Sequence, residues 1–463
     1  MNYNTETVNS VAQELAEMFK KIVIEQEHER VPIAQIERRM REMLRQIGKQ
    51  MLGKFLSSMQ ATPAKEIECQ CGGRLIYQRM RPAMVISVFG RVEYERAYYA
   101  GCQCKEGLAP LDKQFGLDPG AVTAGLAELV AMTGVGHAYD DSPKWLDAYL
   151  LFSVAENTVR SETEMMGALE GEIEEELIEK SQDEEYLQER QRNPGKIVPR
   201  LYGSMDAAKV RIEPRPRKGK TPEKHEDWRD MKTLCWFEVE KVPTAQYSVR
   251  HKEKVEREHV PLRAKNIRYF CDITEAEKFG KLLWATGCAV NADFSPELVF
   301  LGDGAVWIWN LVVKYYPNAI QIVDWYHAEE YLENVAKAAF SSPSERSVWL
   351  EEVTQALWDG QVEKVIITCT DLAQSCDQAR KAVSYFTINI ERMRYDQFRA
   401  GGFMIGSGTV ESGCKQIVTQ RLKIPGAQWS VSGAVQTAKA RAAWLSGSWR
   451  SLCDRRSNLP LAV

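Results

Sequence analysis

Two short apolar runs most constrain the fold that this chain can adopt: LVFLGDGA at residues 298–305 and AIQIVDWYH at residues 319–327. Neither run alternates apolar and polar residues, which is typical of strands buried on both faces of a sheet. The segment between them, VWIWNLVVKYY, is about three helical turns long and is stopped by Pro317. Strand, helix and strand at this spacing predict a parallel βαβ unit.

Further strands and a long helical stretch surround this unit. The strands are expected, in order, at residues 197–207, 234–242 and 267–273. A helix is expected over EAEKFGKLLWATG, residues 275–287. Residues 328–400 have helical patterns throughout, with Pro343 and Gly360 as the breaks. From residue 196 onward the chain is therefore predicted to be an α/β domain that contains one all-helical segment.

The first part of the chain is expected to be helical with one small β module. Helical repeats run through residues 5–58 and break at Pro32, which predicts two amphipathic helices that can pair with a partner chain. From Val85 the sequence VISVFGRVEYERAYY alternates apolar and polar residues, which predicts a β-hairpin or small sheet. Helical periodicity returns at 118–167, and the acidic segment beyond it ends in NPG at 193–195, a predicted boundary.

The composition is that of a folded, cytosolic, multidomain chain. At roughly 100–200 residues per domain, 463 residues predict about two to four domains. No apolar stretch approaches the ~18 residues of a membrane-spanning helix, and the N-terminal segment lacks the features of a secretory signal. The net charge is −4, but residues 209–220 and 415–456 are strongly basic. A polyanion can therefore bind these segments despite the acidic whole.

The cysteines favour reduced thiols and a metal site over a disulfide framework, because their number, 11, is odd and most are isolated along the chain. Four form two C-x-C pairs, Cys69 with Cys71 and Cys102 with Cys104, on either side of the predicted hairpin. Four thiolates are the ligand set of a structural Zn²⁺ site. The alternatives are buried thiols or a redox pair, because the spacing differs from the usual C-x₂-C.

Three carboxylates lie where catalytic groups gather in α/β proteins. Asp206 and Asp303 each follow an apolar run directly, and ligands collect at the carboxyl ends of such strands. Glu411 lies in GSGTVESG, where Ser407 or Thr409 can cap a helix that has Glu411 in its first turn. Together the three acids would suit Mg²⁺, and two such ions support in-line phosphoryl transfer. The alternatives are turn residues for the aspartates and a favourable helix-dipole position for the glutamate.

Three segments carry a resemblance to a known family. LYGSMDAAKVR, LVFLGDGAVWIWNLVVKYYPNAIQIVDWYHAEEYL and GFMIGSGTVESGCKQIV, in this order, resemble the core of bacterial insertion-sequence transposases of the ISKra type. That group is a DDE family with an RNase H-like domain, related to Mutator-like and hAT transposases, and the resemblance covers most of residues 65–450. It implies that Asp206, Asp303 and Glu411 are the catalytic triad and hold two Mg²⁺ or Mn²⁺ ions. Residues 328–400 then resemble the helical insertion of those enzymes.

Asp324 and His327, in DWYH, form a D-x-x-H pair at the end of a predicted strand. The related families have Cys or Asp, two residues and then His at this place. We expect the pair near the metal site but beyond the direct ligands, with His327 reaching a phosphate oxygen and Asp324 fixing its tautomer. The alternative is a histidine that caps the next helix.

Two segments are predicted to contact DNA. SVAENTVRSETEMMG resembles the second helix of a helix-turn-helix, with Asn157, Thr158 and Arg160 on its polar face. The loop between the first two strands of the α/β domain is basic and can bind phosphates through Arg215, Arg217, Lys218 and Lys220. The alternatives are a helix pair within a core and a solvated loop.

The sequence thus predicts a multidomain α+β protein, and the resemblance implies what its parts do. The expected regions are N-terminal helices (1–64), a cysteine-rich β module (65–110), a helical DNA-binding region (111–195), an RNase H-like catalytic domain (196–327 and 401–463) and its helical insertion (328–400). The implied function is a DDE transposase, cytoplasmic and nucleoid-associated when bound to DNA, that acts as a homodimer or larger on transposon ends and target DNA. The alternatives are a transposon-derived DNA-binding protein that does not cut and an RNase H-like nuclease.

Overall fold

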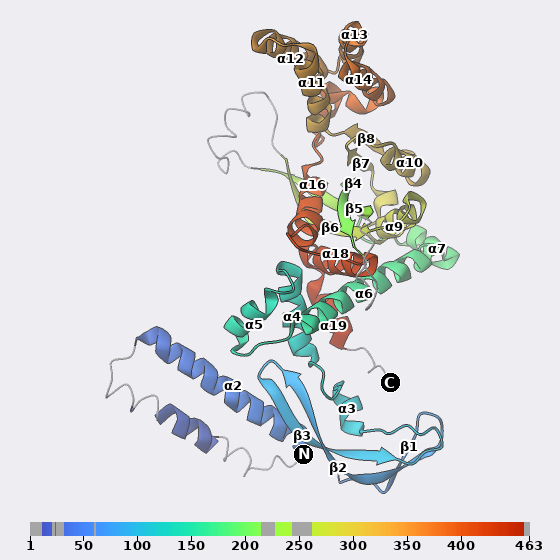
Figure 1. Ribbon diagram of the computed structural model, residues 1–463. Helices are drawn as coiled ribbons and strands as arrows, with labels where there is room; N and C mark the ends of the chain where they lie inside the picture. The colour runs from blue at the N-terminus through green and yellow to red at the C-terminus, as the bar shows by residue number, and fades with distance from the viewer. Residues whose placement is uncertain are drawn as a thin grey trace. The chain divides into compact units, whose positions relative to one another are not determined.

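The computed structural model describes residues 12–20, 24, 32–59, 62–213, 227–242 and 262–457. The fold is mixed α+β with two sheets, as the sequence predicts (Figure 1). The chain divides into two compact units, Met1–Met166 with Arg450–Val463, and Gly167–Trp449. This division falls inside one long helix and not at the predicted NPG boundary, and the finer regions predicted from the sequence remain predictions.

The first unit contains a three-stranded antiparallel sheet with a helix packed against it. Its elements are α2 (Ile33–Ser58), β1 (Glu66–Glu68), β2 (Arg74–Ser87) and β3 (Gly90–Ala100), and residues 12–20 are also helical. The hairpin β2–β3 is longer than the pattern from Val85 predicts, and β2 pairs with β1 as well. Leu56 of α2 packs with Val85, Val92 and Tyr94 of the hairpin in a small apolar core.

Helices make up the rest of the first unit. They are α3 (Pro110–Phe115), α4 (Ala124–Gly136), α5 (Ser142–Leu150), the start of α6 (Glu156–Lys180) and nearly all of α19 (Trp449–Ser457). The helix α4 is apolar on most sides and buried. It crosses α6 closely at Gly134, where a Cβ atom would overlap the Thr163 hydroxyl oxygen.

The second unit is built on a five-stranded sheet of order β6-β5-β4-β7-β8. Its strands are β4 (Arg200–Ile212), β5 (Asp227–Lys241), β6 (Leu262–Asp272), β7 (Glu297–Gly302) and β8 (Ile320–Val323). The first three strands pair antiparallel, whereas β4, β7 and β8 run parallel. With α10 (Val306–Tyr315) between them, β7 and β8 are the predicted βαβ unit, and that prediction is confirmed.

Two predicted strand ends are wrong. β4 does not end at Asp206 but continues to Ile212, because its ladder with β5 extends past the point where β7 stops. β8 stops at Val323 rather than running through DWYH. The reason is that Asp324 accepts a hydrogen bond from the backbone N–H of His327 at 2.9 Å and so caps a helix there.

Helices cover both faces of this sheet (Figure 1). On one face lie α9 (Ala276–Ala289) and α10, where the Trp236 indole donates a hydrogen bond to the Thr286 hydroxyl at 2.9 Å. On the other lie α16 (Gly408–Cys414) and α18 (Val431–Leu445), joined by η4 (Lys415–Thr419) and α17 (Gln420–Leu422). The helix α7 (Glu184–Arg192), the short η2 (Ala292–Phe294) and the part of α6 from Gly167 to Lys180 also belong to this unit.

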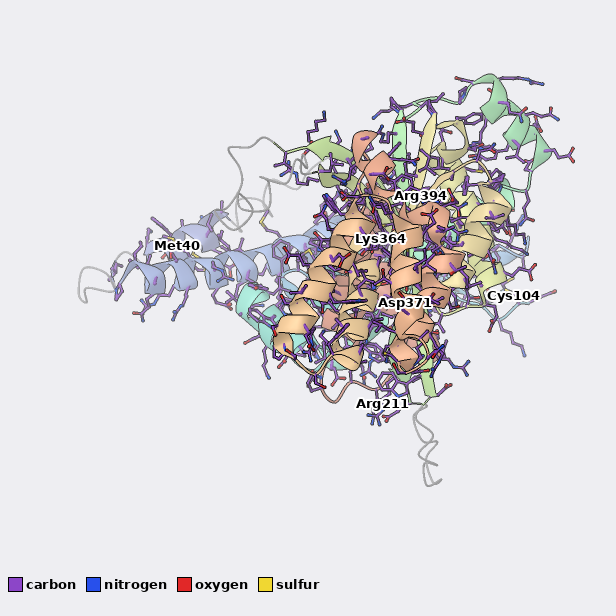
Figure 2. All side chains as sticks on the ribbon, turned by 90° about the horizontal axis from the view of Figure 1, so that it is seen from above. Met40, Cys104, Arg211, Lys364, Asp371 and Arg394 are labelled. Atoms are coloured by element: carbon purple, nitrogen blue, oxygen red, sulfur yellow. The ribbon has the colours of Figure 1, made fainter. Side chains whose placement is uncertain are left out.

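The predicted all-helical segment is confirmed. It contains α11 (Trp325–Ala339), α12 (Pro343–Trp358), α13 (Val362–Leu372), α14 (Asp377–Ile388), η3 (Ile390–Met393) and α15 (Tyr395–Ala400). Pro343 begins α12 and Gly360 follows its end, as predicted. Figure 2 labels Lys364 and Asp371 on α13 and Arg394 just after η3, where Arg394 pairs with Glu363 at 2.7 Å. Among the described residues, none of the helices combines the length and apolarity needed to cross a membrane.

Candidate functional site

The strand register brings three aspartates to one edge of the five-stranded sheet. Ser204 of β4 lies beside Leu301 of β7, so Asp206 and Asp303, two residues further on, are level with each other. Gly302 of β7 lies beside Val323 of β8, which sets Asp303 level with Asp324. Asp303 and Asp324 therefore directly follow the carboxyl ends of β7 and β8, and Asp206 lies within β4 at the level where β7 stops. The carboxyl ends of parallel strands are where α/β proteins place their ligands.

Asp206 faces the α16 side of the sheet. It lies opposite Thr233 of β5, and the Cys414 thiol of α16 is within its hydrogen-bonding reach. Burial raises the pKa of the Asp206 carboxyl above its ordinary value, although the backbone N–H of Ala207 donates to it at 2.7 Å. The negative charge of Asp303 raises the pKa further, and the charge of His327 opposes this. Asp206 is thus a carboxylate whose ionised form gains from a nearby cation.

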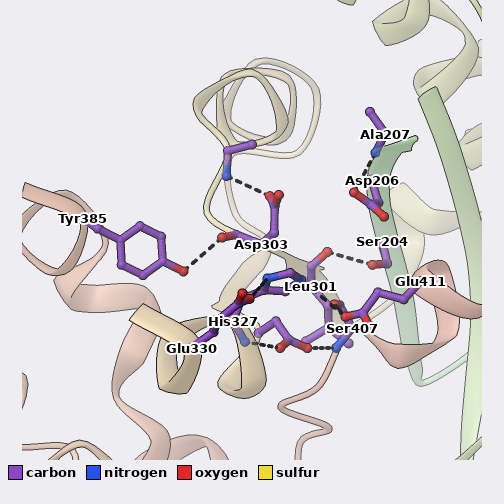
Figure 3. Close-up of polar contacts among 12 residues, drawn as sticks. Ser204, Asp206, Ala207, Leu301, Asp303, His327, Glu330, Tyr385, Ser407 and Glu411 are labelled. Atoms are coloured by element: carbon purple, nitrogen blue, oxygen red, sulfur yellow. Dashed lines mark hydrogen bonds and ion pairs between the residues drawn. The ribbon is translucent and has the colours of Figure 1, made fainter. Parts of the chain in front are cut away.

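Asp303 sits in a short turn between β7 and α10. Its carboxylate accepts a hydrogen bond from the Ala305 N–H at 2.9 Å, and its main-chain carbonyl accepts one from the Tyr385 hydroxyl at 2.9 Å (Figure 3). The turn needs Gly304, because its φ of +95° is a backbone conformation that other residues rarely adopt. The prediction that Asp303 directly follows a strand is confirmed.

Glu411 lies in the first turn of α16, as predicted, but its surroundings differ from the prediction. Ser407 does not cap the helix through its side chain; its hydroxyl donates to the Glu411 carboxylate at 2.7 Å. The His327 Nε2 atom lies 3.5 Å from the same carboxylate oxygen. This contact lowers the pKa of Glu411 and raises the pKa of His327 to about 9. The two side chains therefore form an ion pair at neutral pH.

Asp324 is fully buried and joins two backbone segments. One carboxylate oxygen accepts the His327 N–H that begins α11, and the other accepts the Ser407 N–H ahead of α16. The expectation that Asp324 fixes the tautomer of His327 stays a prediction: both Asp324 oxygens accept backbone N–H groups, and the two ring nitrogens of His327 lie 3.5 Å from Glu411 and 3.9 Å from Glu330. The residue that caps α11 is Asp324, not the histidine. Asp324 thus fixes the starts of the two helices that carry His327 and Glu411.

The side chains at this sheet edge fall into two groups (Figure 3). Asp324, His327 and Glu411 place one ligand atom each within 4.8 Å of one another. Asp206 and Asp303 belong to no group of that kind among the described residues, and Glu411 binds His327 instead of meeting them. The structure therefore brings the predicted triad to one edge of the sheet without closing it around a single point.

The four paired cysteines form a second, tighter cluster in the first unit. The Cys71 sulfur lies 3.4 Å from that of Cys69 and 3.3 Å from that of Cys102, and the Cys69 and Cys104 sulfurs are 3.5 Å apart. These separations exceed the ~2.05 Å of a disulfide and approach the ~3.8 Å edge of a tetrahedron with Zn–S bonds of about 2.3 Å. The cluster can hold a metal ion such as zinc.

Two glycines, Gly72 and Gly73, allow the unusual C-x-C spacing of Cys69 and Cys71 to bring both sulfurs into the cluster. Gly72 adopts φ +80° in a turn in which its N–H donates to the Cys69 carbonyl at 2.9 Å. A Cβ on Gly73 would lie 2.6 Å from the Cys102 sulfur. At the second pair, the backbone of Cys104 and then the Cys71 thiol lower the pKa of Cys102 to about 7. A thiol that ionises this readily is a ready metal ligand.

The residues predicted to contact DNA differ from one another in exposure and in the contacts that they make within the protein. Asn157 is exposed at the start of α6, and Thr158 is half-buried beside it. Arg160 pairs with Glu156 at 2.7 Å and lies over the Tyr139 ring, so its guanidinium is already engaged within the protein. The loop residues Arg215, Arg217, Lys218 and Lys220 lie outside the described residues.

Two residues of the site escaped the sequence analysis. Cys414 contacts Asp206 and follows Glu411 by three residues on α16. Because helical spacing places Cys414 and Glu411 on one face, the sequence around Glu411 was enough to predict that Cys414 lies near the site. Tyr385 had none, because it lies 82 residues from Asp303 in the helical insertion.

No protein-family model matches the chain, and no curated protein matches it.

Proposed function

We propose that this protein is a DDE transposase that binds the ends of a DNA insertion sequence and catalyses metal-dependent strand cleavage and strand transfer. The observation that carries the proposal is the register that sets Asp206, within β4, level with Asp303 just past the carboxyl end of β7. The order and directions of the five strands, three antiparallel and then two parallel, support the RNase H-like domain that the resemblance implies. The helical insertion between β8 and α16 matches the layout that the resemblance implies.

The donor set at the sheet edge fits Mg²⁺ or Mn²⁺. Both ions prefer carboxylate oxygens, and Asp206, Asp303 and Glu411 supply them. The ionisation of Asp206 is opposed by burial and by the charge of Asp303, so a cation between these groups is favourable. Elsewhere in the same unit the buried Glu174 is matched by Lys439, whose raised pKa keeps it charged. When bound, two ions would activate an attacking hydroxyl and stabilise the leaving oxygen.

The chain's own residues have separate tasks in this proposal. Asp206 and Asp303 hold the ions from the sheet, and Glu411 completes the set from α16. His327 carries a positive charge at neutral pH and faces the same edge, where it can neutralise a DNA phosphate oxygen. Asp324 keeps α11 and α16 in place.

DNA contacts come from the first unit and from the basic loop in this proposal. Asn157 and Thr158, at the start of α6, are the proposed base-reading positions. Arg160 is proposed to stiffen that helix end through its contacts with Glu156 and Tyr139, and not to read bases. The basic residues at 215–220 are proposed to bind phosphates.

The cysteine cluster is proposed to hold one structural Zn²⁺ through Cys69, Cys71, Cys102 and Cys104. Cys69 and Cys102 are buried and pack with Leu75, Ala97 and Tyr99 in a core of only a few residues. So small a core gains folding energy from a metal. The protein is proposed to act as a homodimer or larger assembly, by analogy with transposases that pair two ends.

One experiment separates the proposal from its two rivals. Purified protein is incubated with Mg²⁺, a plasmid target and labelled DNA from the inverted repeats that flank the gene. A transposase gives labelled DNA joined to the plasmid. An RNase H-like nuclease gives cleavage without joining, and a transposon-derived DNA-binding protein gives a bound complex without cleavage. Either of the last two results overturns the proposal.

A further inference from the structure

The helical insertion reaches back to the turn that carries Asp303. The Tyr385 hydroxyl, on α14, donates to the main-chain carbonyl of Asp303 at 2.9 Å (Figure 3). Its ring closes over the next residue, because a Cβ on Gly304 would lie 2.5 Å from the Tyr385 ring. A single side chain of the insertion thus contacts both residues of the turn that directs the Asp303 carboxylate.

Tyr385 is itself held in one orientation. It is buried, with 8% of its surface exposed, and its ring stacks on Tyr331 of α11 with centroids 3.8 Å apart and planes 8° apart. Phe386 packs edge-on against it from the same helix. Two helices of the insertion therefore fix the hydroxyl before any ligand arrives, which is the arrangement expected of a positioning group.

A second tyrosine repeats the arrangement on the neighbouring strand. The Tyr395 hydroxyl, at the start of α15, donates to the Val323 carbonyl at the end of β8 at 3.0 Å. Val323 directly precedes Asp324. The insertion therefore binds the carbonyls at the ends of two adjacent strands, β7 and β8, where the acidic residues follow.

We propose that Tyr385 is a positioning residue that sets the affinity of the acid site for its divalent cation, so that the helical insertion controls metal binding. This inference rests on the proposed function, because it takes Asp303 as a metal ligand. The peptide plane of Asp303 determines where its Cβ points, and the hydrogen bond from Tyr385 fixes that plane. Without this hydrogen bond the Asp303 carboxylate samples more orientations. Ordering the carboxylate then lowers the free energy gained when the cation binds.

The test uses Tyr385→Phe, which keeps the ring and its stacking and removes only the hydroxyl. The control is Tyr315→Phe on α10, whose ring stacks on Trp284 away from the turn. Mn²⁺ binding to the zinc-loaded full chain without DNA is measured from the electron paramagnetic resonance signal of free Mn²⁺. Asp303→Asn identifies the ions bound at the acid site. Melting temperatures are measured on the same preparations.

Tyr385→Phe should weaken Mn²⁺ binding at the acid site about three- to tenfold, the scale of one neutral hydrogen bond. Tyr315→Phe should bind as the wild type does. Gly304→Ala, which pushes the turn away from the ring, should weaken binding in the same direction. Unchanged Mn²⁺ affinity in folded Tyr385→Phe overturns the inference, and so does a wild type that binds no Mn²⁺ at Asp303.

The cleavage assay separates this inference from the proposed function. If DNA is cleaved but Tyr385→Phe has the Mn²⁺ dependence of the wild type, the positioning role fails and the transposase proposal stands. If Mn²⁺ binding weakens as expected but no DNA is cleaved, the positioning role stands and the transposase proposal fails. If both hold, Tyr385→Phe should be slow at limiting Mn²⁺ and recover at saturating Mn²⁺.

Discussion

The cysteine cluster and the acid site are two candidate metal sites of opposite character. The four sulfurs lie within 4.8 Å of one another on a short segment, and two of the cysteines are buried. The acids come from β4, the β7–α10 turn and α16, and Glu411 binds His327 instead of closing on the aspartates. The cysteine cluster is closed around one point, as structural zinc sites are, whereas the acid site is open.

The difference follows from chain distance and from charge. One hairpin and its two flanking turns set the positions of all four sulfurs, so local folding assembles that site. The acids are assembled by long-range sheet pairing, and gathering three carboxylates without a cation is unfavourable. We therefore expect metal at the cysteines to stabilise the fold and metal at the acids to serve chemistry. The predictions that follow test this contrast, beginning with the largest effect.

Removal of zinc should unfold the hairpin region but leave the second unit folded. Apparent zinc-binding free energies in small domains are about 10–16 kcal/mol, far more than so small a core supplies. Hydrogen exchange should show loss of amide protection across 66–100 on chelation and recovery when Zn²⁺ is returned. The protein as purified should contain about one zinc per chain.

Cys71→Ser and Cys102→Ser should lose the zinc, and Cys288→Ala, a buried cysteine outside the cluster, should keep it. Wild-type stability in both serine variants, together with no detectable zinc, would remove the site.

A buried acid that has its own cation should behave differently from the acids of the acid site. Lys439 pairs with the fully buried Glu174 and lies 3.3 Å from Asp272. Lys439→Met should destabilise the second unit by about 3–5 kcal/mol, because it leaves a buried carboxylate without its partner. Urea unfolding measures this. Lys337→Met, which breaks an exposed pair with Glu333, should cost at most about 1 kcal/mol, and equal costs would contradict this account.

Asp206→Asn should slightly stabilise the protein that has no divalent cation at the acid site, whereas Cys71→Ser should destabilise the zinc-loaded protein. Burial and the charge of Asp303 raise the pKa of Asp206, so its ionised form costs stability at neutral pH. A gain of up to about 1 kcal/mol in the free energy of unfolding is expected, within the ordinary range of single substitutions. Asp371→Asn on the exposed face of α13 is the matched control and should change little. A clear loss of stability in Asp206→Asn would give that carboxylate a structural role.

The last prediction concerns a pKa, not the effect of a substitution on stability, and tests the pH dependence of the His327 pair. The pKa of His327 is raised from 6.5 to about 9, chiefly by Glu411. Its contribution to stability is therefore fully present below about pH 6.5 and is lost as pH rises through about 9. Nuclear magnetic resonance of the imidazole protons should give this pKa, and Glu411→Gln should return it toward 6.5. Glu330→Gln should move it less, because Glu330 lies 3.9 Å from the other ring nitrogen.

The sequence predicted the parts of the molecule that depend on local pattern. The βαβ unit, the helical insertion, the hairpin and the cysteine pairs each occupy one continuous segment, so periodicity and spacing are enough to find them. The expectation that Asp303 follows a strand also held, because an apolar run ends visibly before it.

The contacts that define the acid site could not be predicted in the same way. His327 meets Glu411, and Tyr385 meets Asp303, only because the insertion folds back on the sheet. The predicted end of β8 is wrong because an aspartate after an apolar run can either continue a strand or cap a helix. Here Asp324 caps α11 by accepting a hydrogen bond from the backbone N–H of His327. The internal pairing of Arg160 with Glu156 followed ordinary i,i+4 helix spacing and was overlooked.

The most direct test of the account is the rate of Mg²⁺-dependent cleavage of the flanking inverted-repeat DNA by wild type, Asp206→Asn, Asp303→Asn and Glu411→Gln. Each preparation is also assayed for DNA binding and melting temperature, so that a misfolded variant is recognised. The account predicts cleavage by the wild type and a loss of several orders of magnitude in each folded variant, with DNA binding retained. Cleavage at the wild-type rate by any folded variant would remove that carboxylate from the catalytic set, and retention of activity by all three would contradict the account.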